Sequence, residues 1–449
     1  MSCEAQIEQW RSYLRRRQAI HAVDVAELED HLREQIGALE DSGLAADEAF
    51  LVAVKRMGSL DALSREFARE HSARLWKQLV MADPQSPGAA ASARTDTIAA
   101  FALAIAAAVA LKLPALFGLD LEHDSAFYAR NASLFALPFL AGYFVRKRGN
   151  GASTIQWLAG AFVVAAVFAN VYPFAQGGST QRLAALHLPM ALWIVVGIAY
   201  AGERWREPAG RMDFIRFSGE LFIYYVLIAL GGGVLTAFMA MVFHAIGIDM
   251  ERFVQSWLLP CGAAGAVIVA AWLVEAKQSV IENMAPVLTR LFTPLFAAML
   301  LAFLAAMAVT GRALDMERNV LIGFDLLLAV VLGLLLYSIS ARDPQAPPGA
   351  FDVVSVVLVL SALAADAVAL WAIAARINEF GLTPNRVAAL GENVILLVNL
   401  GWSAVLYMRF LRRRGTFADL ERWQTDYVPF YAAWAAIVAI AFPPVFGYA

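Results

Sequence analysis

The chain has 449 residues, of which 60% are hydrophobic and 16% are charged, and its formal net charge is −3. A soluble globular protein has about 45–50% apolar and about 25% charged residues, so the composition excludes an ordinary soluble protein. The near-neutral charge gives no reason to expect a nucleic-acid partner. After residue 96 the apolar residues fall in blocks of roughly 18–25 residues, the length that crosses a bilayer. We therefore predict an all-α, multi-pass membrane protein.

Residues 1–81 predict a separate soluble domain of amphipathic helices. Apolar positions recur at helical spacing over residues 25–39 and again over residues 49–57. Each helix exposes one apolar face, so we expect the helices to pack as a small bundle. Residues 82–96 are rich in proline, glycine, alanine and serine, and they predict a flexible linker. The start of the chain is charged and lacks an apolar core, so we expect no signal peptide.

The pattern of this first domain is similar to that of a known family. The segments that carry the similarity are Glu29-Asp30-His31-Leu32, Asp47-Glu48-Ala49-Phe50, Lys55-Arg56-Met57-Gly58 and Leu63 to Phe67. Together they resemble the bacterial permease prefix domain of the HAAS type. In that family the domain precedes the membrane segments of permease-like or signalling proteins. The resemblance implies a cytoplasmic domain that contacts a protein partner through residues 1–80.

Eleven apolar spans follow in residues 97–449, and we expect each to cross the membrane as a helix. They lie near 97–117, 126–145, 153–174, 183–201, 217–245, 253–275, 288–311, 319–340, 352–375, 389–409 and 427–447. If the N-terminus is cytoplasmic, the inner loops carry roughly twice as many Arg and Lys side chains as the outer loops, as the positive-inside rule requires. We therefore expect a bacterial inner-membrane protein with its N-terminus inside and its C-terminus outside.

Residues that interrupt helices lie inside three of these spans. They are Gly231-Gly232-Gly233 in the fifth, Pro260 in the sixth and Pro294 in the seventh. Glycine and proline are common in membrane helices, where small residues permit close packing. They also occur in the discontinuous helices that line substrate paths in transporters. The sequence leaves both interpretations open, although it shows no internal repeat of the kind that many transporters have.

The loop after the ninth span resembles a second family. Its residues are Arg376-Ile377 and Glu379-Phe380-Gly381-Leu382-Thr383-Pro384-Asn385-Arg386. They are similar to the signature of a bacterial membrane family called domain of unknown function 4153, in which tyrosine usually stands at the position of Phe380. The segment from Tyr427 to Phe446 is similar to the last span of that family. This resemblance implies a bacterial membrane protein and no particular activity.

Polar residues at membrane depth give the main functional signal, because an acid at the centre of a membrane helix costs roughly 2.5–3.5 kcal/mol on insertion scales. Such a residue persists where it finds a partner or a water-filled cavity. The outer half of spans eight to ten is expected to hold six such residues: Asp325, Asp366, Arg376, Arg386, Glu392 and Asn399. They predict either a substrate, ion or lipid-headgroup site, with a proton-coupled carboxylate as one form of it, or a structural network around residues 376–386.

Other chemistry has little support in the sequence. Motifs for nucleotide binding, serine hydrolases and zinc proteases are absent from it, so we expect no enzyme and no cofactor. Cys3 and Cys261 are expected in different environments, so we predict no disulfide and no cysteine-based metal site. His123, His187 and His244 are expected as separate interfacial residues near the outer face, and a metal site would require them to converge.

Three functions are compatible with these features. The first is a permease-like or transporter-like protein in contact with membrane lipids, with a cytoplasmic regulatory domain. The second is a membrane sensor or scaffold whose prefix domain binds a cytoplasmic partner, and the third is a membrane-embedded, lipid-modifying enzyme. A cavity that reaches Asp366 would favour transport, whereas Asp366 packed against an arginine without a cavity would favour the sensor. A lipid headgroup against two carboxylates would favour the enzyme.

Overall fold

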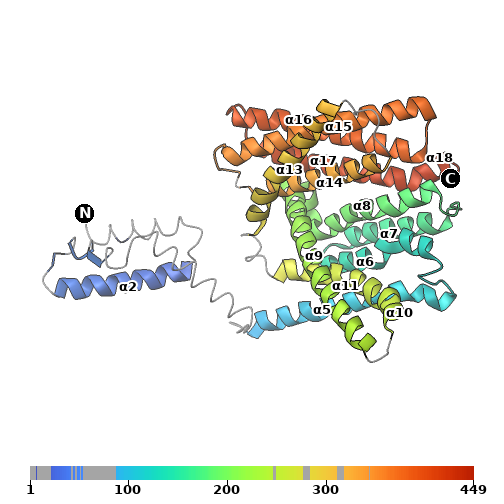
Figure 1. Ribbon diagram of the computed structural model, residues 1–449. Coiled ribbons are helices and arrows are strands. Elements are labelled where there is room, and N and C mark those ends of the chain that lie inside the picture. The colour runs from blue at the N-terminus through green and yellow to red at the C-terminus, as the bar shows by residue number, and fades with distance from the viewer. Residues whose placement is uncertain are drawn as a thin grey trace. The chain divides into compact units, whose positions relative to one another are not determined.

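The computed structural model describes residues 7, 22–41, 44–45, 48–50, 52–53, 87–245, 249–276, 284–310, 318–342 and 344–449. Within these residues every regular element is a helix, as predicted (Figure 1). The chain divides into two compact units, residues 1–93 and residues 94–449.

The first unit contains α2 (Ala22–Asp41), whose apolar stripe is buried as the periodicity predicts. Leu32, Ile36 and Leu39 are buried on one side of this helix. They pack together with Ala49 and Ala53 in one small core. The helices predicted beyond residue 53 lie outside the described residues, and so does most of the predicted bundle.

Helix α5 (Pro87–Lys112) leads into the second unit, and it begins inside the predicted linker. Pro87 occupies the first helical position, where its missing N–H group costs nothing. The alanines that follow have the highest helix propensity of all residues. Residues 87–96 are therefore helical and do not form the flexible linker that their composition suggested, and residues 82–86 lie outside the described residues.

Nine helical segments in the described part of this unit are long and apolar enough to cross a membrane. They are α5 with η1 (Leu113–Phe117), α7 (Ala152–Val171), α8 (Ser179–Ala201) with η2 (Gly202–Arg206), α9 (Pro208–Ala245), α10 (Glu251–Phe253) with η3 (Val254–Leu258) and α11 (Leu259–Ala276), α13 (Met284–Thr310), α15 (Ala350–Phe380), α16 (Pro384–Leu411), and α17 (Phe417–Ala436) with η4 (Ile437–Ala441) and α18 (Phe442–Val445). Each of them coincides with a predicted span, which indicates a multi-pass membrane protein.

The two other predicted spans are also helical, but they are less apolar or shorter. They are α6 (Ser125–Arg148) and α14 (Arg318–Ser340), whose apolar described part is Asp325–Ser340. In α6 the Nε of Arg130 donates to a backbone carbonyl of α7 at 3.1 Å, and Asn131 exchanges side-chain hydrogen bonds of 2.9 and 2.8 Å with Asn170 of α7. Helix α7 thus satisfies the polar groups that lower the hydropathy of α6.

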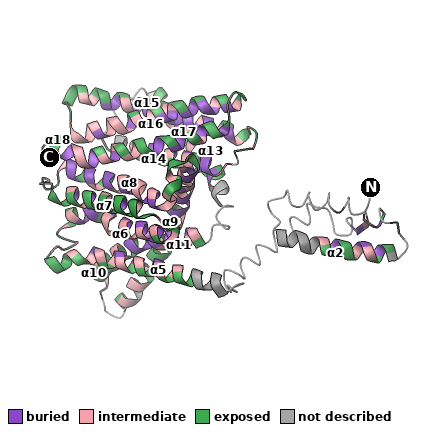
Figure 2. Cartoon of the chain, turned by 180° about the vertical axis from the view of Figure 1, so that it is seen from behind, coloured by how far each residue is buried: buried purple, intermediate pink, exposed green. Residues whose placement is uncertain are grey.

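Two hydrophobic cores lie on either side of α9 in the second unit (Figure 1). One core is formed by α5 to α8, α11 and the start of α9, and the other by α13 to α17. Helix α9 supplies Phe214 and Phe217 to the first core and Met212 to the second. Buried residues recur along α8 and α17, whereas most of α7 is exposed (Figure 2).

The predicted helix breakers do not interrupt two of the three spans. Helix α9 runs through Gly231-Gly232-Gly233, where an added Cβ would meet open space, and α13 runs through Pro294. The interpretation of these two spans as discontinuous helices is therefore wrong. Pro260 follows the π-helical turn η3, so only the sixth span has an irregular segment beside its proline.

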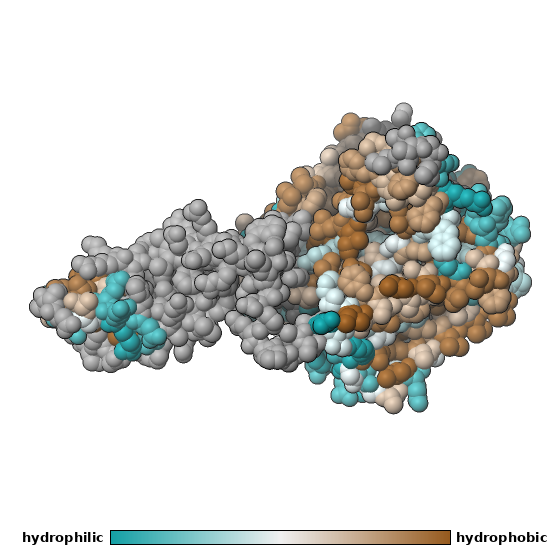
Figure 3. All heavy atoms as spheres, turned by 90° about the horizontal axis from the view of Figure 1, so that it is seen from below, coloured by the Kyte–Doolittle hydropathy of each residue, from teal (hydrophilic) through white to brown (hydrophobic). Residues whose placement is uncertain are grey.

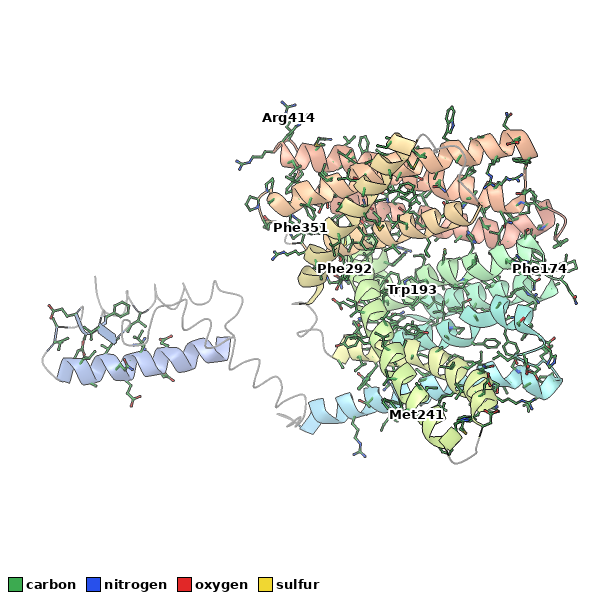
Figure 4. All side chains as sticks on the ribbon, viewed as in Figure 1. Phe174, Trp193, Met241, Phe292, Phe351 and Arg414 are labelled. Atoms are coloured by element: carbon green, nitrogen blue, oxygen red, sulfur yellow. The ribbon has the colours of Figure 1, made fainter. Side chains whose placement is uncertain are left out.

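The surface and the ends of the helices agree with a membrane location. Large apolar side chains such as Phe101, Leu235 and Phe222 are exposed, and Figure 3 shows apolar atoms over much of one face, with hydrophilic atoms toward its edges. A soluble protein rarely exposes so large an apolar area. Figure 4 places Phe351 and Arg414 at one end of the helices and Phe174 at the opposite end, as alternating spans require.

Tyr172 contributes a hydrogen bond where the last helix is irregular. Pro444 has no N–H, so the carbonyl of Ile440 lacks its usual donor four residues ahead. The hydroxyl of Tyr172 donates to this carbonyl at 3.1 Å. We expect Tyr172→Phe to lower the free energy of unfolding by about 0.5–1.5 kcal/mol, measured by thermal unfolding in detergent. Tyr448→Phe is the control, because that hydroxyl has no partner among the described residues, and equal midpoints for the two variants would contradict the prediction.

Candidate functional site

A cavity of about 790 Å³ lies between the two halves of the second unit. Helices α6, α8, α9, α11, α14, α16 and α17 line it, so both cores contribute to its wall. Most of the wall is apolar or aromatic, and it includes Trp193, Tyr225 and Trp434. Figure 4 shows Trp193 near the middle of the unit. Small-molecule sites in proteins have volumes of about 300–1,000 Å³ and walls of this kind, so the cavity is a candidate binding site.

Four polar residues of the cavity lie at one level. Ser133, His187, Asp325 and Glu392 each follow the first residue of their own helix, α6, α8, α14 or α16, by seven or eight positions. At about 1.5 Å per residue this is about 10–12 Å from the helix start. These four helices all run in the same direction in an alternating arrangement. They therefore place a polar layer at one end of a cavity whose other walls are mostly apolar.

His187 and Glu392 form the closest polar contact in this layer. The Nε2 atom of His187 lies 2.5 Å from an Oε1 atom of Glu392, and its Nδ1 atom lies 2.9 Å from the carbonyl oxygen of Leu183. The carbonyl can only accept, so Nδ1 donates to it, and Nε2 is the ring nitrogen that faces the carboxylate of Glu392. His187 is buried within the protein and pairs with Glu392, so it is not the exposed, separate histidine that the sequence suggested.

Asp325 enters the same cavity from α14. Its Oδ1 accepts a hydrogen bond of 3.1 Å from Nδ2 of Asn393, which also donates to the carbonyl of Ala389. Three other buried polar atoms of residues that line the cavity have no hydrogen-bond partner in the described structure: Oγ of Ser133, Oδ1 of Asn393 and Nε1 of Trp434. Buried polar atoms are nearly always paired, so three unpaired atoms in residues of one cavity wall are unusual.

Asp366 lies in the middle of α15 and is completely buried. Neither of its carboxyl oxygens has a hydrogen-bond partner among the described residues, although Asp325 is within electrostatic range. The cavity does not reach Asp366, and Arg376 does not pair with it. The two residues are ten positions apart on one helix, which corresponds to about 15 Å along its axis. The described residues therefore show neither a cavity at Asp366, which would favour transport, nor an Asp366–arginine pair, which would favour a sensor.

The loop signature has a structural role in the described residues. Nη1 of Arg386 donates to the carbonyls of Phe380 and Gly381 at 3.0 and 2.8 Å, and the guanidinium group lies over the ring of Phe380. Gly381 has φ 75°, a conformation that favours glycine, and the hydroxyl of Thr383 caps the start of α16. Arg386 therefore fastens the turn between α15 and α16. Arg376 has no ion pair within the part of the chain that the structure describes.

Asn399 belongs to a separate network between α16 and α17. Its side-chain amide donates to Oε1 of Gln424 at 3.0 Å and to the hydroxyl of Tyr431. Its Oδ1 accepts from Ser403 at 2.9 Å and from Trp423 at 3.0 Å. It bonds to neither Asp366 nor Asp325 within the described structure, so the expectation of a single polar cluster that includes Asn399 is wrong.

The cavity thus contains two of the six residues expected in the cluster, Asp325 and Glu392, together with His187, Asn393 and Ser133, which were not singled out for it. His187 had a usable signal, because an ionisable residue inside an apolar span is rare and needs a partner. Among the described residues, no group of three or more His, Cys, Asp or Glu side chains is arranged to hold a metal ion.

Comparisons with protein-family models, with curated proteins and with solved structures give no match to this chain. The two family resemblances therefore stay predictions, and the cavity carries the functional argument.

Substitution of Asp366 tests whether this residue stabilises or destabilises the fold. A buried polar group without a partner costs about 1–3 kcal/mol. Its removal leaves only a small space among alanines on the same helix face, and alanine has the higher helix propensity. We expect Asp366→Ala to raise the thermal midpoint in detergent. In contrast, Asp352→Asn should lower it, because Asp352 pairs with Arg342 at 2.8 and 3.0 Å. A lower midpoint for Asp366→Ala would show that Asp366 stabilises the fold.

Proposed function

We propose that this protein is a permease-like membrane protein of the bacterial inner membrane, and that the cavity between its two halves binds the transported molecule. The proposal rests on the position of the cavity between helices of two separate cores, with ionisable and amide groups at one level. A scaffold gains nothing from such a space, because protein interiors are normally filled and their polar atoms paired.

In this proposal all eleven helical segments cross the membrane, α6 and α14 included, and the N-terminus lies in the cytoplasm. The positive-inside rule supports this orientation. Contacts at the inner ends of the helices support it as well. Lys147 and Arg148 at the end of α6 both pair with Glu275 of α11 at 2.8 Å, so these charges can remain beside the membrane.

The transport step in this proposal is a movement of one half against the other. The cavity is bounded by α6, α8 and α11 of one core and by α14, α16 and α17 of the other. A change in the angle between the halves would open the cavity first to one side of the membrane and then to the other, as alternating access requires. The polar layer near the outer end would hold the transported molecule during this change.

Labelling of single cysteines tests this movement without knowledge of the substrate. In a variant with Cys3 and Cys261 replaced by serine, Ala329→Cys places a thiol in the cavity wall. A membrane-impermeant methanethiosulfonate is then added to right-side-out or to inside-out vesicles. We expect labelling of residue 329 from both sides. Glu122→Cys and Arg414→Cys are the controls, because these exposed positions should each react from one side only, outside and inside respectively.

The sensor or scaffold remains the second candidate function. The compact unit of residues 1–93 and the fastened turn between α15 and α16 favour it. It predicts a fixed membrane domain, so residue 329 would react from one side at most. That result in vesicles where both control positions react as expected would overturn the transport proposal.

A further inference from the structure

The charges around the cavity indicate which chemical class of molecule it takes, if the cavity is the substrate site of the proposed function. The described residues that line it include two carboxylic acids and one histidine, but no lysine or arginine. A site for an anion would need at least one cation or a cluster of N–H donors, and the lining has no such cluster.

Glu392 already has a partner within this lining. Its Oε1 atom lies 2.5 Å from Nε2 of His187. Asp325 is then the one acid of the described lining without a histidine or cationic partner, since its described hydrogen bond comes from the neutral amide of Asn393.

The rest of the wall suits the apolar part of a ligand. Trp193, Tyr225 and Phe222 present aromatic rings, whose faces attract cations as well as apolar groups. Met190 and Phe222 also line the cavity, yet 57% and 65% of their surface is exposed. The cavity therefore opens on the apolar side surface of the protein, where a molecule dissolved among acyl chains can enter.

We propose that the cavity binds a lipophilic organic cation, such as an amine, ammonium or phosphonium compound with large apolar groups. Its positive charge lies at the level of Asp325, and its apolar groups contact the aromatic wall. Charge complementarity selects this occupant over a lipid anion or a neutral acyl chain. The absence of a metal-holding group among the described residues excludes an inorganic ion with protein ligands of that kind.

Two probes of equal size and opposite charge test the proposal. Full-length protein in lipid nanodiscs is titrated with radiolabelled tetraphenylphosphonium and, separately, with tetraphenylborate, and binding to empty nanodiscs is subtracted. We expect the phosphonium to bind at least about tenfold more tightly than the borate, a difference of about 1.4 kcal/mol. Equal affinities, or tighter binding of the borate, would overturn the proposal.

Variants locate the binding in the cavity. Asp325→Asn should weaken phosphonium binding by about tenfold and should not weaken borate binding, because loss of the negative charge removes attraction for the cation and repulsion of the anion. Glu379→Gln is the control for loss of an acid, since Glu379 is exposed at the end of α15 and lies outside the cavity. Ala329→Phe fills the cavity without a change of charge and should abolish phosphonium binding. Unchanged phosphonium affinity in both Asp325→Asn and Ala329→Phe would overturn the assignment.

These experiments separate the inference from the proposed function. Charge-selective binding with one-sided labelling of residue 329 would retain the cation site and overturn transport. Labelling from both sides without charge selectivity would retain transport and overturn the cation site.

Discussion

Asn399→Ala is expected to destabilise the membrane unit by at least about 2 kcal/mol, because it removes the centre of a buried network. Asn399, Ser403 and Gln424 are completely buried. The substitution would remove the side-chain acceptor of the Trp423 indole N–H and the donor to Oε1 of Gln424, and each buried unpaired group costs about 1–3 kcal/mol. The measurement is the midpoint of thermal or urea unfolding of purified protein in detergent. The substitution is expected to weaken the packing of α16 against α17.

A double-mutant cycle identifies the network as the cause. Gln424→Ala alone breaks the bonds of Gln424 with Asn399 and Ser403, which are 3.0 and 2.6 Å long. The double variant Asn399→Ala with Gln424→Ala should be less destabilised than the sum of the two single variants, because the one bond that the two residues share is lost only once. Additive losses, or a wild-type midpoint for Asn399→Ala, would contradict the network.

Gly391→Ala is the second substitution with a large expected effect. A Cβ at this position would lie 1.9 Å from Cζ2 and 2.2 Å from Cη2 of Trp434. The indole ring is rigid and half-buried between α16 and α17, so it must move as a whole. Overpacking of this kind typically costs about 1–3 kcal/mol. We therefore expect a lower unfolding midpoint, and also weaker ligand binding, because Trp434 lines the cavity.

Gly401→Ala is the matched control on the same helix. There the added Cβ would meet Cδ1 of Leu363 at 4.0 Å, an ordinary contact, and alanine has the higher helix propensity. Gly401→Ala should leave the midpoint unchanged or raise it. If the clash is the cause, Trp434→Ala should recover part of the stability lost in Gly391→Ala. A midpoint for Gly391→Ala equal to that of Gly401→Ala would contradict the close contact.

The helices were predictable because bilayer length and apolar composition are local properties of the sequence. The sequence also predicts α6 as a helix. It does not predict that α7 provides the hydrogen-bond partners of Arg130 and Asn131. The extent of α5 was underestimated, because the small residues after Pro87 suggest a linker as readily as a helix. The composition of residues 87–96 is compatible with either a linker or a helix.

The site was only partly predictable, because counting residues along a span gives depth and not direction. Asp366 and Asn399 were both expected in one polar cluster in the outer half of their spans, yet Asn399 bonds to α17, and among the described residues Asp366 has only Asp325 within electrostatic range. The side chains within one helical turn point in all directions, so depth along the span does not say which neighbouring helix a side chain contacts. Apolar residues on all sides of a membrane helix also remove the amphipathic pattern that would reveal the direction. His187 and Glu392 are separated by 205 positions, so no local feature announces their contact.

The last helical segment has a consequence for biosynthesis. Residues 417–449 follow all the other described helices in the sequence, yet Val438 of η4 packs in one cluster with Leu183 of α8, and the backbone N–H of Thr180 donates to the carbonyl of Ala449 at 2.8 Å. The first half of the membrane unit can gather its own core while the ribosome is still translating the second half. Its face toward α17 nevertheless stays open until residues 417–449 have been made. Insertion of α17 is therefore the step that completes the wall of the cavity.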